Sequence, residues 1–67
     1  MSVAKVTEIS AESTKSFEDA IQHGLTRAGK TLKGIQGAWI AEQKVVWSGD
    51  HISAYRVTMK VTFVLND

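Results

Sequence analysis

A strict alternation of apolar and polar residues near the C-terminal end most constrains how this chain can fold. From Tyr55 to Leu65 every second side chain is apolar, and the residues between them are polar except for Val64. Because successive side chains of a strand point to opposite faces, the pattern predicts a strand with one apolar face over residues 55–65. That face needs a cover, which the rest of the chain must supply.

One amphipathic helix is predicted upstream of this strand, over residues 17–33. Apolar and small residues recur there at spacings of three and four, which places them on one side of a helix. They are Phe17, Ala20, Ile21, Gly24, Leu25, Ala28 and Leu32. Acidic residues precede basic ones along the segment, as the helix dipole favours, with Ser13 as the expected N-cap and Gly34 as the expected C-cap.

Two further strands are predicted, over residues 2–9 and 37–47. The first is short and rich in β-branched residues, and the second ends at a hairpin turn signal, Ser48 to Asp50. The predicted fold class is therefore α+β. Its element order is β-α-β-β, with a three-stranded antiparallel sheet wrapped on one helix.

The strand over residues 37–47 does not alternate cleanly. Regular alternation puts Ala38 and Ile40 on one face, and the other face receives a set of small, aromatic and polar residues. These are Gly37, Trp39, Ala41 and Gln43. The run Val45-Val46-Trp47 indicates either a bulge that swaps faces or burial on both sides. One helix covers only one side of a sheet, so we expect the Trp39 side to need a partner.

Chain length and composition also favour self-association. The chain has 67 residues and no cysteine, so we expect a single domain over residues 1–67 without disulfides. A domain of this size is marginally stable alone, and small domains compensate with disulfides, metals or oligomerisation. Its two histidines are too few for a structural zinc site, and we expect no metal site.

Several classes of function are disfavoured by the sequence. A net charge of +1 is too balanced for a protein that binds mainly nucleic acid. We find no signal peptide and no apolar segment of about 20 residues, so the expected location is cytoplasmic, without membrane insertion. No spacing among His23, His51, Ser48 and Asp50 favours catalysis, and the chain is expected not to be an enzyme. Its glycines match no phosphate-binding loop.

The tryptophans and a basic cluster are the remaining candidates for binding. Trp47 is expected in the core or in an interface. Trp39 has small or polar neighbours, which suits either a packed subunit interface or a stacked planar ligand. Arg27, Lys30 and Lys33 form either a solvated basic helix end or a patch for an anionic ligand.

Three segments of the sequence resemble the dodecin family. They read KVTEISAESTKSFEDAI, LTRAGKTLKGI and AYRVTMKVTFVLND, and the similarity covers essentially the whole chain. The resemblance implies a hollow homododecamer of β-α-β-β subunits that binds small molecules without catalysis. It also implies that the shell sequesters a flavin, either riboflavin or FMN. The flavins of relatives are bound in pairs at two-fold axes, between tryptophans. Coenzyme A is a ligand of some relatives.

The sequence departs from the family pattern at two positions. Gly37 stands where the family has its flavin-stacking tryptophan, and Arg56 stands where it has the glutamine that hydrogen-bonds the flavin ring. By the same resemblance, Lys5 and Lys44 fall on positions of ligand contacts. Arg27 and Lys33 fall on positions that contact coenzyme A.

Two hypotheses follow from these departures. Trp39 lies two residues beyond Gly37, about 6–7 Å along the strand. It could take over the stacking role, with Gln43, Lys44 and Arg56 holding the polar edges of the flavin. Alternatively, the chain forms a dodecin-like shell that has lost flavin binding. Such a shell would hold an anionic ligand or ion (coenzyme A, a nucleotide or a metal ion) or nothing small. An anionic ligand is considered because the planar guanidinium group of Arg56 suits a carboxylate or phosphate.

Overall fold

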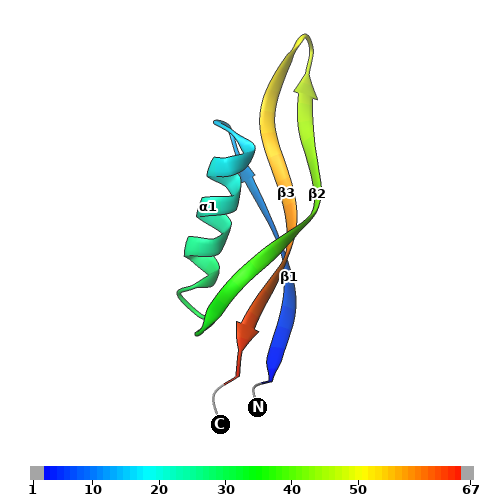
Figure 1. Cartoon of the computed structure of the whole chain (residues 1–67). Helices are drawn as coiled ribbons and strands as arrows, with labels where there is room; N and C mark the ends of the chain where they lie inside the picture. The colour runs from blue at the N-terminus through cyan, green and yellow to red at the C-terminus, as the bar shows by residue number, and fades with distance from the viewer. Residues whose placement is uncertain (1–2, 66–67) are drawn as a thin grey trace.

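The structure, a computed structural model, describes residues 3–65. Its elements are β1 (Ala4–Ser13), α1 (Phe17–Ala28), β2 (Ile35–Ser48) and β3 (His51–Val64), shown in Figure 1. The β-α-β-β order predicted from the sequence is confirmed. No helix within residues 3–65 is long and apolar enough to cross a membrane.

The strand with the strict alternation lies at the centre of the sheet. The strand order is β1-β3-β2, and β3 pairs antiparallel with both neighbours. Val57, Met59 and Val61 of β3 are completely buried. Their β-branched or unbranched apolar side chains fill the narrow space under the helix, while their backbone groups pair on both sides.

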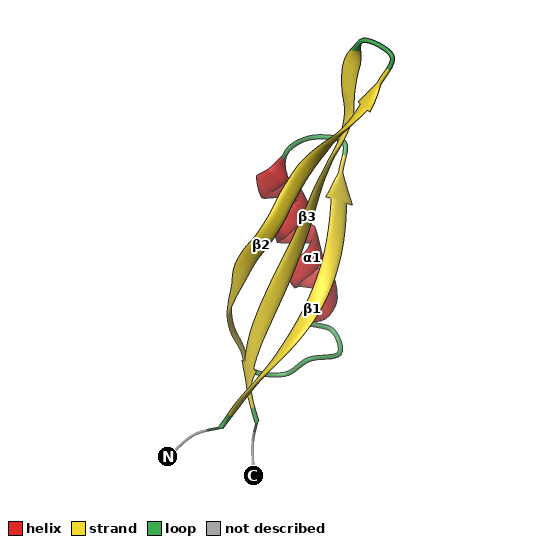
Figure 2. Ribbon diagram, turned by 90° about the vertical axis from the view of Figure 1, so that its right-hand side faces the viewer, coloured by secondary structure: helices red, strands yellow, loops and turns green. Residues whose placement is uncertain are grey.

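Helix α1 covers one face of this sheet, as Figure 2 shows. Ala20 is completely buried against the β3 core. Gly24 brings the helix close to the sheet, because a Cβ atom there would lie 2.6 Å from Met59 Cε and 3.0 Å from Ala11 Cβ. The helix thus packs over β1 and β3 and leaves the opposite face of the sheet without a cover.

The helix begins and ends at different residues from those predicted. Its N-cap is Ser16, whose hydroxyl accepts a hydrogen bond from the Asp19 amide at 3.0 Å. The prediction of Ser13 is wrong, because Ser13 is the last residue of β1. The Ser13 hydroxyl instead donates to Asp19 Oδ2 at 2.6 Å and accepts from the Lys15 amide at 2.9 Å. It therefore ties the end of β1 to the first turn of α1.

At its other end the helix stops at Ala28, five residues before the predicted Lys33. Gly29 is the C-cap, and its amide donates to the Leu25 carbonyl at 2.9 Å. Gly34, the predicted C-cap, lies just before β2 with a φ of +74°, where its carbonyl accepts from the Val64 amide. Only a glycine adopts this φ without strain. Its role is to start the strand.

The hairpin between β2 and β3 projects well beyond the rest of the subunit (Figure 1). Pairing with β1 ends at Ser13 and Tyr55, so the ribbon beyond has only two strands. The predicted turn over residues 48–50 is confirmed, with Gly49 at a φ of +64°. The first and last predicted strands are too short, since β1 continues to Ser13 and β3 begins at His51.

The irregularity expected in β2 is present: its register against β3 shifts at Val46/Trp47, inside the apolar run, and also earlier, at Ile35/Gly37 and at Ile40/Glu42. Ile40 pairs with Met59 and Glu42 pairs with Thr58, so Ala41 is one extra residue in β2. Side chains after Ala41 therefore change faces relative to the regular alternation. Gln43 consequently lies opposite Val57, on the helix side. The expectation that it shares a face with Trp39 is wrong.

Candidate ligand-binding face

The face of the sheet that α1 leaves uncovered, here called the outer face, carries most of the candidate flavin-site residues. Antiparallel partners point to the same side of a sheet, so the pairing defines this face. One row across the three strands is Glu8, Lys60 and Trp39. The next row is Ser10, Thr58 and Glu42, and the row after it is Glu12, Arg56 and Lys44. Acidic and basic side chains are therefore interleaved with an aromatic side chain on this face.

Trp39 is the largest apolar group on the outer face. It is 70% exposed, although its backbone lies within the β2–β3 pairing. Beside it lies a hollow of about 260 Å³ lined by Gln36, Gly37, Ala38, Trp39 and Thr62. A Cβ atom on Gly37 would meet nothing within 4 Å. The structure thus places an indole plane next to open space, an arrangement in which a flat ring can stack.

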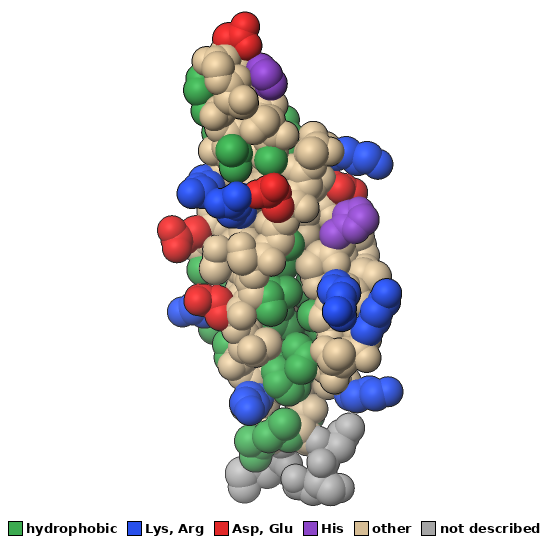
Figure 3. Space-filling model, turned by 180° about the vertical axis from the view of Figure 1, so that it is seen from behind, with side chains coloured by type: hydrophobic (Ala, Val, Ile, Leu, Met, Phe, Trp, Pro, Cys, Tyr) green, Lys and Arg blue, Asp and Glu red, His purple; other side chains and the backbone are tan. Residues whose placement is uncertain are grey.

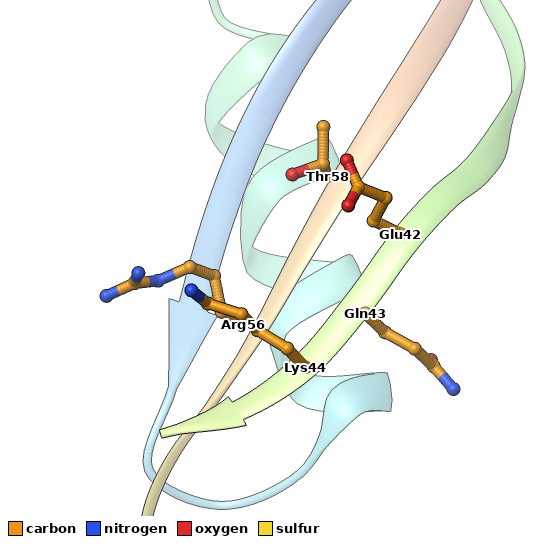
Figure 4. A pocket seen from close by; sticks show the side chains of 5 residues that line it. All are labelled: Glu42, Gln43, Lys44, Arg56 and Thr58. Atoms are coloured by element: carbon orange, nitrogen blue, oxygen red, sulfur yellow. The ribbon is translucent and has the colours of Figure 1, made fainter. Parts of the chain in front are cut away.

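A second hollow, of about 230 Å³, lies further along the same face. Its lining residues are Glu42, Gln43, Lys44, Arg56 and Thr58, shown in Figure 4. Gln43 points away from the other four side chains in this view, as its pairing with Val57 requires. Lys44 and Arg56 supply the positive charge of this hollow.

Arg56 is already engaged by a carboxylate of its own chain. Its Nε and Nη2 atoms donate to Glu12 Oε1 at 2.9 and 2.6 Å. Both side chains are about half exposed. Sequence reasoning missed Glu12, because the pairing of β1 with β3 that brings it opposite Arg56 depends on register. Much of the charge expected to attract an anionic ligand is thereby neutralised.

Four of the six predicted flavin-site residues share the outer face. Gly37, Trp39, Lys44 and Arg56 lie there. Lys5, by contrast, pairs with Phe63 and lies with Gln43 on the helix side. Within one subunit, Lys5 and Gln43 therefore cannot approach a ligand stacked on Trp39 from the same side.

The two residues predicted to contact coenzyme A are both exposed and lie at the far end of α1. Arg27 is in the last turn, and Lys33 is in the loop before β2. Arg27 also borders a hollow of about 360 Å³ between α1 and β1, here called the α1–β1 groove. The groove is lined by Ile9, Ser10, Ala11, His23, Gly24, Arg27, Ala28 and Thr31.

The histidines lie in exposed pairs with neighbouring carboxylates. His23 Nε2 is 3.5 Å from Asp19 Oδ1, and His51 Nδ1 is 3.1 Å from Asp50 Oδ1. Within residues 3–65 no group of three or more His, Cys, Asp or Glu side chains is placed to hold a metal ion.

Comparison with known proteins relates this chain to one family. The sequence profile of the Dodecin family matches residues 3–66. The dodecin from Streptomyces davaonensis has a TM-score of 0.93 and 30% identity, with coverage of 98% of this chain and 97% of that one. An arginine-to-alanine variant of the Thermus thermophilus dodecin has a TM-score of 0.94 and 30% identity, with both chains fully covered.

A third solved structure, the dodecin from Streptomyces coelicolor, is 21% identical with a TM-score of 0.92 and shares the fold. The match covers 98% of this chain and 94% of the Streptomyces coelicolor chain. No curated protein sequence matches the chain significantly. The profile match over nearly the whole chain, together with the 30% identical relatives, shows that this chain belongs to the dodecin family.

Proposed function

We propose that this chain is the subunit of a cytoplasmic homododecameric shell that binds and sequesters a flavin, riboflavin or FMN, without catalysing a reaction. One observation carries the proposal: an exposed Trp39 beside the open hollow at Gly37, on a sheet face that the subunit itself does not cover. Membership of the dodecin family supports a small-ligand-binding assembly of this kind.

Stacking on Trp39 is the source of affinity in this proposal. Offset stacking of aromatic rings contributes about 0.5–1.5 kcal/mol beyond the burial of the apolar area itself. In a symmetric pair of subunits the same face meets itself, so a two-fold axis near Trp39 would supply two indoles to one ligand pair. The side chain exposed in one subunit would then be covered on both sides.

The polar contacts would come from one end of the outer face. Lys44 borders the second hollow and is exposed. Arg56 would contribute less than its charge suggests, because Glu12 holds two of its nitrogen atoms. The proposed site therefore recognises chiefly the flat ring. We leave Gln43 and Lys5 out of it, because their side chains lie on the helix side.

A second candidate function is a shell without bound flavin. The Glu12–Arg56 pair favours it, since the residue at the family's ring-binding position is turned toward its own chain. The pockets of such a shell would hold an anionic ligand or ion, coenzyme A at Arg27 and Lys33 among them, or nothing small.

A titration of riboflavin and FMN with flavin-stripped protein distinguishes the two candidates. We expect saturable quenching of flavin fluorescence at about one flavin per subunit. Trp39→Ala should weaken binding by about tenfold or more, the loss of one good stacking contact. Trp47→Phe is the control, because Trp47 is also exposed (63%) but lies on the projecting hairpin.

Two results would count against flavin storage at Trp39. Equal affinity of Trp39→Ala and the unmodified protein would place the flavin elsewhere. Absence of quenching by micromolar unmodified protein would instead favour the shell without flavin.

A further inference from the structure

The hollow beside Trp39 contains two polar side chains in addition to its aromatic wall. They are Gln36 and Thr62, which line this hollow together with Gly37 and Ala38. Gln36 is exposed and Thr62 is partly buried. The hollow itself therefore offers a carboxamide and a hydroxyl group to a ring that stacks on the indole.

Gln36 owes its position to an irregularity at the start of β2. The β3 partners of Ile35 and Gly37 are consecutive residues, so Gln36 is an extra residue of β2 without a partner of its own. A bulge of this kind re-aims the side chain of the extra residue and is common next to functional sites. Ile35 packs against the buried core, so the backbone beside Gln36 is anchored in the sheet.

The carboxamide of Gln36 has unused hydrogen-bonding capacity. Its Nε2 atom donates to the Gly34 carbonyl at 3.5 Å, the long limit for a hydrogen bond. That carbonyl also accepts from the Val64 amide at 3.1 Å. Within residues 3–65 neither Gln36 Oε1 nor the Thr62 hydroxyl has a hydrogen-bond partner. An acceptor and donors are therefore available to a ligand in this hollow.

A carboxamide complements the imide edge of a flavin ring. That edge presents one N–H group, N3–H, between two carbonyl oxygens. A carboxamide carries an acceptor and a donor side by side, so Gln36 can accept from N3–H and donate to one of the carbonyls. The Thr62 hydroxyl can donate to the other carbonyl. Together the two side chains match the whole edge.

Charged side chains are less suited to this recognition. Acidic and basic groups are interleaved on the outer face, and Figure 3 shows side chains of both signs along one flank of the subunit. A flavin ring is uncharged and gains little from such a mixed field. Its N–H and carbonyl groups nevertheless need hydrogen-bond partners when they leave water. Neutral side chains inside the hollow meet that need.

We propose that Gln36 binds the imide edge of a flavin ring stacked on Trp39, with Thr62 as the second hydrogen-bonding group. The inference rests on the proposed flavin binding and names the residues that select the ring. The site would thus take flat heteroaromatic rings with a free imide N–H and discriminate against rings in which that N–H is blocked.

Lumiflavin and N3-methyllumiflavin test this contact, because they differ only at the imide nitrogen. Fluorescence titration with flavin-stripped protein gives a dissociation constant for each. We expect the unmodified protein to bind N3-methyllumiflavin about tenfold more weakly, since the methyl group removes one hydrogen bond and leaves Gln36 Oε1 unpaired. Gln36→Leu, of similar size but without polar groups, should weaken lumiflavin binding about tenfold and bring the ratio of the two constants close to one.

Matched variants separate this contact from general effects. Gln43→Leu is the control for Gln36→Leu, because Gln43 lies on the helix side. Thr62→Val keeps the shape of the side chain and should weaken lumiflavin binding about threefold. Its control is Thr7→Val, since Thr7 pairs with Val61 on the helix side and should leave binding unchanged. Size-exclusion chromatography checks that every variant keeps the elution volume of the unmodified protein.

Trp39→Ala distinguishes failure of this inference from failure of flavin binding itself. It should weaken both rings by a similar factor, because stacking does not involve the imide nitrogen. Binding that depends on Trp39, with a ratio of the two constants that is the same in Gln36→Leu and in the unmodified protein, would overturn the role of Gln36 alone. Failure of the unmodified protein to bind lumiflavin would overturn both the role of Gln36 and the proposed flavin storage.

Discussion

Glu12 and Arg56 show how one ion pair can determine what a binding face recognises. They face each other across β1 and β3, and two guanidinium nitrogens share one carboxylate oxygen. Exposed pairs of this kind add only about 0–1 kcal/mol to stability. The Glu12–Arg56 pair should affect ligand binding more than stability, because an anionic ligand would have to compete with Glu12 for the same guanidinium N–H donors. Arg56 is thus chemically suited to phosphate but occupied.

Replacing Glu12 by glutamine should therefore change ligand preference more than stability. Glu12→Gln removes the competing charge, and we expect the affinity for FMN relative to riboflavin to rise about three- to tenfold, the value of one typical net hydrogen bond. Dissociation constants for both flavins provide the ratio. Glu8→Gln, opposite Lys60 on the same face, is the control. An unchanged ratio in Glu12→Gln would show that the pair does not govern phosphate recognition.

At the scale of elements, periodicity predicted which segments form helix and strand, but not where they end. The β3 alternation and the apolar stripe of α1 each span many residues, so single exceptions do not obscure them. A cap depends on one hydrogen bond, and Ser16 carries the same hydroxyl group as the predicted Ser13 only three residues further along the chain. Similarly, the apolar spacing continues to Leu32, yet the helix ends at Ala28.

The bulge at Ala41 had a larger consequence for the predicted site. One extra residue shifts every later side chain of the strand to the other face. Because alanine is compatible with either face, the alternation of apolar and polar residues does not reveal that Ala41 is the extra residue. Gln43 was assigned to the wrong face for this reason. Gly37 and Trp39 precede the bulge, so their placement on one face follows from regular alternation.

The identity of the N-cap can be tested by stability. Ser16→Ala removes the acceptor for the Asp19 amide and should lower the free energy of unfolding by about 1 kcal/mol. Thr14→Ala, exposed in the same loop, should have little effect. Denaturant unfolding of both variants at equal subunit concentration measures the difference. A larger loss for Thr14→Ala would contradict the assignment.

The buried core of the whole subunit is small compared with its exposed apolar surface. Within residues 3–65 the buried hydrophobic residues are Ala20, Ala54, Val57, Met59 and Val61. Both tryptophans remain exposed, and the Cα trace is an elongated body of 51 × 19 × 13 Å. A thin subunit of this kind leaves much apolar surface exposed, and we expect its stability to rise with subunit concentration.

Native mass spectrometry of flavin-saturated protein tests this account most directly. We predict an assembly of twelve subunits, the number typical of the family, carrying about one flavin per subunit. Trp39→Ala should keep the twelve subunits and lose the flavins, because it removes the stacking surface and changes no other residue of the subunit. A stable monomer would contradict the account, and so would a Trp39→Ala assembly that retains its full complement of flavin.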